Sequence, residues 1–205
     1  RFINLIVVHC SATRCDRCYT EHDLTTDHLR RGFSGAGYHF YIRKNGDIKS
    51  LRPLALPGAH VRGWNAGSIG VCYEGGLDEC GRPADTRTPF QRHSLRVLVL
   101  LLLKDYPGSR LCGHRDLSPD LNHNGEIEPE EWVKQCPCFD AATILTEPAP
   151  PNPAYYEMFL FSFSAFFART HIYIMCSYFL SFPFFQNCSL EMRLCCLLYT
   201  SDAAD

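Results

Sequence analysis

The chain has 205 residues with 20 basic and 22 acidic side chains, which gives a formal net charge of −2. This balance gives no electrostatic reason to expect nucleic acid as a partner, because binding to a phosphate backbone relies on an excess of lysine and arginine. The length allows one or two domains. The 12 cysteines follow no regular disulfide framework. Cys15 and Cys18 are interpreted as surface thiols, with a metal or redox pair as the alternative.

The chain opens with a predicted central strand, which is followed by a helix. Residues 3–9 form a continuous apolar run, which is typical of a strand buried on both faces of a sheet. His9 then lies at the carboxyl end of this strand, where open α/β sheets bind their ligands. A helix is predicted over residues 20–31, because Thr20 is a suitable N-cap and Gly32 a suitable stop.

A hairpin and a further strand are predicted next. Residues 37–53 favour a β-hairpin, because apolar and polar side chains alternate and Asn45-Gly46 is a strong two-residue turn signal. Residues 54–65 are rich in glycine and proline and are predicted to form a loop. Residues 68–74 then predict a short strand that two glycines bring to an end.

A long apolar helix is predicted over residues 88–105. Thr88 can cap it, Pro89 suits the first helical position, and Gln91 completes a capping box. Apolar side chains occupy nearly every position between 95 and 103, which indicates a helix buried against other layers of the fold. The uncharged run is about half of the roughly 20 residues needed to cross a bilayer, so stable membrane insertion is not expected.

The order of these elements predicts the α/β class, with a single domain whose central mixed β-sheet is flanked by helices. We expect this domain to span residues 1–147 and a tail to span residues 148–205. The tail lacks helix or strand periodicity, and residues 196–205 resemble the translation of a sequencing adapter, so the tail is predicted to be disordered or a read-through artefact. Arg169 and His171 interrupt its apolar run, which disfavours the alternative of a membrane anchor.

The segment 113–140 contains residues suited to a metal centre. His114 stands at its start, Cys136 near its end, and Lys134 two residues before that cysteine. Imidazole and thiolate groups bind transition metals, and a lysine ammonium group can stabilise negative charge that develops near by. His9, at the end of the first predicted strand, is the candidate for the third ligand.

The same segment contains a match to the 12-residue calcium loop. Asp120, Asn122, Asn124 and Glu131 stand at ligand positions of this pattern, with a glycine at its sixth place. Pro129 and the absence of a helical pattern before the loop argue against a complete EF-hand. The segment therefore predicts either a Ca²⁺ site between two of the metal ligands or, as the alternative, an Asx-rich turn.

Five motifs follow one another along the chain: HCSAT, GYHFYIRKNGDI, NAGSIGVCYEGG, GHRDLSPD and KQCPCFD. Over residues 3–145 the chain resembles the zinc-dependent N-acetylmuramoyl-L-alanine amidases of the phage T7 lysozyme type, which share a fold with peptidoglycan recognition proteins. The resemblance implies a peptidoglycan hydrolase that uses zinc-activated water. Its target would be the amide bond between N-acetylmuramoyl residues and the L-alanine of the stem peptide.

The resemblance also implies roles for individual residues. His9, His114 and Cys136 match the three Zn²⁺ ligands of the family, and Tyr38 and Lys134 match the two residues that stabilise the oxyanion. Considered alone, Tyr38 would be interpreted as a core aromatic residue of the hairpin, and Lys134 as a solvated residue at the end of a helix.

The strand over residues 68–74 departs from a related group of amidases. Those enzymes have a different ligand set and place a glutamate where this chain has Cys72. Glu74 is near by and is expected to point elsewhere. The departure favours a mechanism that relies on lysine and tyrosine.

The loop before that strand offers a candidate wall for the substrate. His60 and Trp64 can present ring faces to a sugar or a peptide, and Asn65 can pair with an amide group. Packing of the loop is the alternative explanation for all three.

The resulting prediction is an enzyme that cleaves peptidoglycan. The alternative is a non-catalytic peptidoglycan recognition module, and such proteins characteristically lack the cysteine that is present here as Cys136. Peptidoglycan is the expected partner and a monomer the expected form. The start of the chain shows no signal-peptide pattern. Localisation therefore stays open between a cytoplasmic protein that is released to reach the cell wall and an exported one whose chain start is missing.

Overall fold

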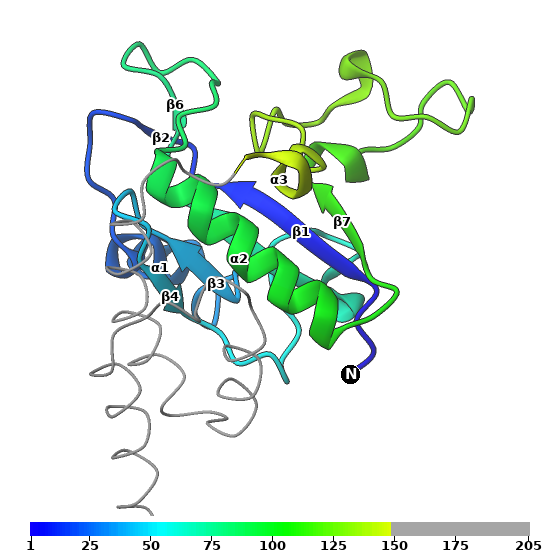
Figure 1. Cartoon of the computed structure of the whole chain (residues 1–205), viewed down its shortest axis with the longest axis horizontal. Helices are drawn as coiled ribbons and strands as arrows, with labels where there is room; N and C mark the ends of the chain where they lie inside the picture. The colour runs from blue at the N-terminus through cyan, green and yellow to red at the C-terminus, as the bar shows by residue number, and fades with distance from the viewer. Residues whose placement is uncertain (149–205) are drawn as a thin grey trace, which may run out of the picture. The chain divides into compact units, whose positions relative to one another are not determined.

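A five-stranded mixed sheet forms the centre of the computed structural model, which describes residues 1–148. The strands in spatial order are β4 (Ile48–Ser50), β3 (Phe40–Ile42), β5 (Ser68–Tyr73), β1 (Leu5–Cys10) and β7 (Arg110–Gly113). Strand β1 pairs in parallel with β7, which lies beside it in Figure 1, and with β5 on its other side. Strand β3 pairs in parallel with β5, and β4 alone is antiparallel to its neighbour. The predicted mixed sheet is confirmed.

The predicted central strand lies where the sequence places it. All six residues of β1 are buried, as are all six of β5 beside it. Burial on both faces favours apolar side chains, which is why the first four residues of β1, LIVV, show no alternation; His9 is the buried polar exception. The register sets Val8 beside Gly113 and His9 beside Cys72. His9 is therefore held at the carboxyl edge of the sheet by strands on both sides.

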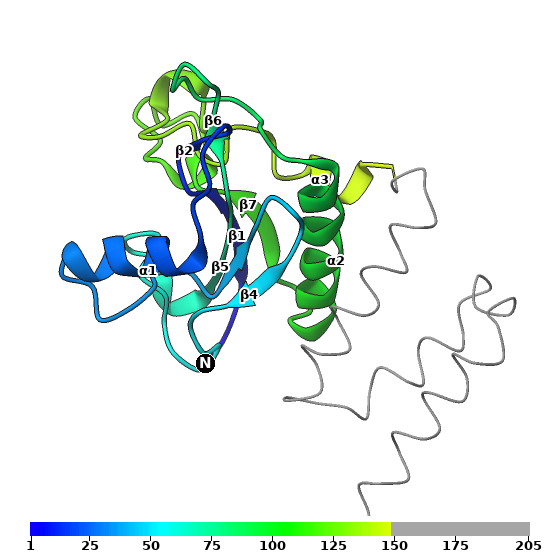
Figure 2. The ribbon, with the colours of Figure 1, turned by 90° about the vertical axis from the view of Figure 1, so that its left-hand side faces the viewer.

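Two helices cover opposite faces of the sheet. Helix α1 (Glu21–Arg30) lies on one face and helix α2 (Pro89–Asp105) on the other (Figure 2). Both begin at the predicted caps, since Thr20 and Thr88 each accept a hydrogen bond from the third helical backbone N–H. Gly32 follows the end of α1 with φ of 85°, a conformation that glycine adopts without strain.

The hairpin of β3 and β4 lies in the predicted place but has a longer turn. Ile42 pairs with Ile48, and the backbone N–H of Arg43 donates to the carbonyl of Asp47 at 2.9 Å. Three residues rather than two therefore form the loop. Gly46 has φ of 89°, so its left-handed conformation completes a three-residue turn instead of the predicted two-residue one.

Several short elements were not predicted because each is too short to show a period. Strand β7 has four residues, and a separate two-stranded sheet joins β2 (Thr13–Arg14) to β6 (Gly76–Leu77). The remaining elements are three 3₁₀ turns and one short helix: η1 (Asn65–Gly67), η2 (Arg115–Leu117), η3 (Pro129–Glu131) and α3 (Thr143–Thr146). Within residues 1–148, no helix combines the length and the apolar character needed to cross a membrane.

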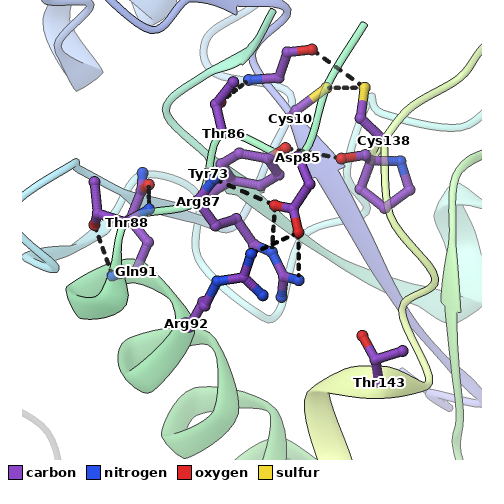
Figure 3. A network of polar contacts seen from close by, with 12 residues as sticks. Cys10, Tyr73, Asp85, Thr86, Arg87, Thr88, Gln91, Arg92, Cys138 and Thr143 are labelled. Atoms are coloured by element: carbon purple, nitrogen blue, oxygen red, sulfur yellow. Dashed lines mark hydrogen bonds and ion pairs between the residues drawn. The ribbon is translucent and has the colours of Figure 1, made fainter. Parts of the chain in front are cut away.

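An ion-pair cluster ties the end of the described chain to α2. The side chain of Arg87 is 1% exposed and pairs with Asp85 at 2.9 Å and with Glu147 at 2.8 Å. Arg92 on α2 pairs with Asp85 at 2.7 Å, as Figure 3 shows, and with Glu147 at 3.0 Å. The Arg87 guanidinium also lies 3.3 Å from the centre of the Phe139 ring. These contacts of the described chain therefore reach Glu147. The predicted tail, residues 148–205, lies outside the described residues from residue 149 on.

We expect that deleting residues 150–205 leaves the melting temperature and the activity on peptidoglycan nearly unchanged. The deletion retains Glu147, which contributes the last ion pairs of the described chain. Thermal unfolding and a turnover assay on the full and the shortened chain measure both quantities. A large loss of either would contradict the predicted boundary.

The matched variant is Glu147→Gln in the shortened chain. It leaves the buried Arg87 with only one of its two carboxylate partners, and loss of a hydrogen bond to a charged group costs about 2 kcal/mol. We expect a lower melting temperature for this variant than for Glu130→Gln, whose side chain is exposed.

Candidate metal centre

Two histidines and one cysteine from distant parts of the chain meet at the carboxyl edge of the sheet. His9 is the fifth residue of β1, His114 directly follows β7, and Cys136 lies in the loop after η3. Their ligand atoms all lie within 4.8 Å of one another. Nδ1 of His9 is 3.7 Å from Sγ of Cys136, and the rings of His9 and His114 have centroids 4.8 Å apart. Within residues 1–148, no other group of three or more His, Cys, Asp or Glu side chains has this spacing.

Backbone contacts hold Cys136 in this position. Its sulfur accepts a hydrogen bond from the backbone N–H of Cys10 at 3.3 Å, and its carbonyl accepts one from the N–H of Arg115 at 2.8 Å. The hydroxyl of Tyr73 donates to the carbonyl of Pro137 at 2.8 Å (Figure 3). The loop is thus attached to β1, to the segment after β7 and to β5, and the thiol has little freedom to move away from the two histidines.

The surroundings of the two histidines keep them neutral. Complete burial lowers the pKa of His9 well below its usual value near 6.5, and the charges of His60, His114 and Lys134 lower it further. Burial, followed by the charge of Lys134, lowers the pKa of His114 to about 4. Both imidazoles are therefore neutral at pH 7, which is the form that ligates metals.

The donor set fits Zn²⁺. Two neutral imidazoles and one cysteine thiolate are common zinc ligands, and three protein ligands leave a fourth position open, as in catalytic rather than structural sites. Cys138, a second thiol two residues after Cys136, lies outside the group. Its sulfur is 3.9 Å from that of Cys10 and donates to the carbonyl of Gly76 at 3.3 Å (Figure 3).

Tyr38 and Lys134, the two predicted catalytic residues, both lie near this group. The ring centroid of Tyr38 is 5.0 Å from that of His9. Burial raises the pKa of the Tyr38 hydroxyl well above its usual value near 10, so the hydroxyl stays protonated and can donate a hydrogen bond. The side chain of Lys134 is exposed, and its positive charge contributes to the lowered pKa values of both His9 and His114.

The predicted substrate wall divides into three different environments. His60 lies against His9, with 3.0 Å between its Nδ1 and Nε2 of His9. The side-chain oxygen of Asn65 accepts the backbone N–H groups of His60 and Val61 at 2.8 and 3.0 Å, so it braces the loop. Trp64 is 44% exposed and offers its ring to the solvent. Contact of these residues with a substrate stays a prediction.

A cavity beside α1 was not predicted from the sequence. It has a volume of about 360 Å³, and its lining includes Tyr38, whose ring centroid is 5.0 Å from that of His9. Most of its other lining residues belong to or directly follow α1: Leu24, Asp27, His28, Arg30 and Arg31. The helical pattern alone could not identify this surface, because the polar face of a helix usually faces solvent.

The contacts of Glu74 show why this residue cannot serve as the glutamate base. Glu74 is buried, and its carboxylate accepts the backbone N–H groups of Tyr19 and Lys44 at 2.8 and 3.0 Å. It therefore points away from the metal centre, as predicted. Cys72, at the position where related amidases have glutamate, is fully buried beside it in β5.

The segment with the calcium pattern is closed by its own side chains. Asp120 accepts the N–H of Gly125, and Asn122 and Asn124 each accept the N–H two residues further on, all at 2.8 to 2.9 Å. Glu131 accepts the N–H groups of Leu121, Asn122 and Glu128 at 2.7, 3.1 and 3.0 Å. These contacts match the Asx-turn alternative. The calcium prediction gains no support from them.

Glu131→Gln is expected to lower the melting temperature in the presence of a chelator, because an amide presents one acceptor oxygen where the carboxylate presents two. The calcium prediction is tested in the same experiment. If the loop binds calcium, the ion raises the melting temperature of the parent by mass action but not that of the variant. If the melting temperature of the parent does not change when calcium is added, with zinc held constant, the result contradicts calcium binding.

The buried histidines predict that the metal-free protein loses stability in acid. Burial lowers the pKa of His39 to about 4 and that of His60 to about 3, as it does for His114. The unfolded chain takes up protons near pH 6.5, before the folded one does, so the free energy of unfolding falls as the pH falls from about 6.5 to about 4. Each group adds a slope of at most about 1.4 kcal/mol per pH unit.

Urea unfolding with a chelator across this pH range measures the slope. His39→Gln removes one buried histidine and should reduce the slope, whereas His22→Gln, at an exposed position, should not. A free energy of unfolding that stays constant over the range would contradict the prediction.

Comparison with known proteins places the chain among peptidoglycan amidases. Residues 1–137 match the family described as N-acetylmuramoyl-L-alanine amidase. The endolysins of Enterobacteria phage T3 and Escherichia phage T7 are 37% and 36% identical over 135 residues, which is 66% of this chain and 80% of each endolysin.

A solved structure agrees with these matches. The N-acetylmuramoyl-L-alanine amidase LysC from Clostridium intestinale URNW is 28% identical, with a TM-score of 0.51 over 77% of this chain and 85% of LysC. The resemblance carried by the five motifs is confirmed, and the chain belongs to the N-acetylmuramoyl-L-alanine amidase family.

Proposed function

We propose that this protein hydrolyses the amide bond between the N-acetylmuramoyl residue of peptidoglycan and the L-alanine of its stem peptide, at a Zn²⁺ ion held by His9, His114 and Cys136. Membership of the amidase family supports the reaction class. The single observation that carries the metal assignment is the convergence of three zinc-type donors, from three segments, within 4.8 Å.

The folded chain keeps the proposed ligands in the protonation state and the positions that metal binding requires. The lowered pKa values of His9 and His114 keep both lone pairs free at neutral pH, and the loop contacts hold the sulfur of Cys136 beside them. When bound, zinc would supply a Lewis acid that polarises the amide carbonyl and acidifies a coordinated water to a pKa near 7.

Tyr38 and Lys134 are proposed to stabilise the oxygen that gains negative charge when the amide is attacked. The protonated Tyr38 hydroxyl can donate a hydrogen bond, and Lys134 contributes a positive charge. Donors that are held in position before the reaction lower a barrier most, and the closeness of the Tyr38 ring to that of His9, 5.0 Å, supports such a role for Tyr38. Substrate access supports this role for Lys134, because its side chain is exposed.

The cavity beside α1 is proposed to hold the stem peptide. It shares Tyr38 with the metal centre, so a chain lying in it would present its first amide near that centre. Arg30 and Arg31 contribute positive charge to the lining, although Arg30 also pairs with Asp27 at 3.3 Å. This charge favours a peptide that carries carboxylates.

The substrate implies that the protein acts on the cell wall. The three proposed ligands and both proposed catalytic residues come from one chain, so a monomer suffices for the reaction. The expected monomeric state follows from this completeness and is tested by measuring the mass of the protein in solution.

Three variants test the assignment. Cys136→Ala should lose zinc and with it all turnover. Lys134→Ala should retain zinc, because lysine is not a ligand, and lose about 100- to 1000-fold in turnover, as the removal of one oxyanion donor typically does. Tyr38→Phe should have a milder effect of the same kind, since only a hydroxyl is lost. Affinity for the muropeptide should change less than turnover, because both contacts strengthen in the transition state.

Zinc content, muropeptide affinity and release of stem peptide are measured on the parent and all variants. Lys49→Ala is the matched control, because this lysine lies on edge strand β4 and pairs with Asp47 at 3.3 Å. It should retain full turnover. A parent that holds zinc and binds muropeptide but releases no stem peptide would refute the enzyme and favour the recognition module.

A further inference from the structure

His60 forms a polar link between His9 and β5. Its Nδ1 is 3.0 Å from Nε2 of His9, and its Nε2 is 3.3 Å from Oγ of Ser68, the first residue of β5. The rings of His60 and His9 meet nearly edge to face, with centroids 5.0 Å apart and planes at 82°. The ring of His60 is therefore directed at the nitrogen of His9 that faces away from Cys136.

The backbone around His60 leaves a space of the right shape for an imidazole. A Cβ atom at Gly70, on β5, would stand 2.6 Å from Cδ2 of His60, and one at Gly58 would stand 2.3 Å from the same atom. Any other residue at either position would displace the ring. The side chain of Asn65 meanwhile holds the backbone N–H of His60 at 2.8 Å. The two glycines thus leave room for the ring, and the asparagine fixes the backbone that carries it.

The contacts favour one arrangement of protons. Nδ1 of His9 faces the sulfur of Cys136 at 3.7 Å, so this nitrogen must keep its lone pair free to ligate a metal. If Nδ1 of His9 is the ligating atom, the proton of its neutral ring lies on Nε2 and can be donated to Nδ1 of His60, 3.0 Å away. A neutral His60 then carries its own proton on Nε2, 3.3 Å from Oγ of Ser68, which can accept it. All donors in the chain point in one direction, from His9 towards β5.

We propose that His60 is a positioning residue, which holds His9 in the tautomer and the ring orientation that direct Nδ1 towards the metal. This inference rests on the proposed zinc centre and gives His60 a task other than contact with the substrate. Partners that orient a ligating histidine through its second nitrogen commonly determine metal affinity. The contact lies on the side of His9 opposite Cys136.

Zinc affinity by competition with a chelator, and the visible absorption of the Co²⁺-substituted protein, test the proposal. His60→Ala should weaken zinc binding about 10- to 100-fold and alter the Co²⁺ spectrum, because the His9 ring can then rotate or change tautomer. His60→Asn should retain most of the affinity, because its side-chain oxygen can accept the proton near the position of Nδ1. Ser68→Ala should weaken binding less than His60→Ala, since it removes only the far end of the link.

Controls separate this role from a general effect on the fold. His22→Ala, at an exposed position, should leave the zinc affinity unchanged. The melting temperatures of the metal-free variants report on folding alone. If His60→Ala does not fold, His60→Leu fills the space without offering an acceptor and should show the same weakening.

Two results would overturn the inference, and they are distinguishable. If the parent binds no zinc, the proposed metal centre fails and this inference fails with it. If the parent binds zinc but His60→Ala, or His60→Leu in its place, binds it within about threefold of the parent, only the positioning role is refuted.

Discussion

The parallel pairing of β1 with β5 on one side and β7 on the other is the constraint on which the rest of the structure depends. Parallel strands end at the same edge of a sheet, so this pairing alone sets His9 and His114 side by side although they are far apart in the sequence. It requires β1 to be apolar on both faces, which the run LIVV supplies. The same pairing sets the start of β5, with Ser68 and Gly70, beside the loop that carries His60. Ligands and their surroundings are thus consequences of one strand arrangement.

A buried polar cluster in such a position costs desolvation energy, and the fold offsets it with specific contacts. His9 is fully buried, yet both of its ring nitrogens face polar atoms, one the sulfur of Cys136 and the other a nitrogen of His60. Glu74, which directly follows β5, shows the same pattern. Its buried carboxylate accepts hydrogen bonds from two backbone N–H groups. The buried ionisable groups in and next to the sheet are therefore either kept neutral, as His9 is, or hydrogen-bonded to backbone donors, as Glu74 is.

Short-range signals in the sequence predicted the elements whose formation depends on interactions within a few residues. The cap at Thr88, the stop at Gly32 and the buried run of β1 all act within a few residues, so the printed sequence contains them. The motifs likewise indicated which side chains meet at the centre. The partner of His9 could not be predicted in this way. The contact of His60 with His9 depends on Gly70 leaving space across the sheet, and no pattern within the loop itself reports on a strand that folds beside it. Strand β7 escaped prediction for a related reason, since four residues at a sheet edge carry too little periodicity.

The spacing of the donors along the chain has a consequence for synthesis. His9 and Cys136 are 127 positions apart, and His114 lies between them. A growing polypeptide therefore exposes the first donor early and completes the triad only when nearly the whole described domain has left the ribosome. Partial chains that end before Cys136 hold at most two of the three donors. The proposed zinc centre can therefore form only after translation has passed Cys136.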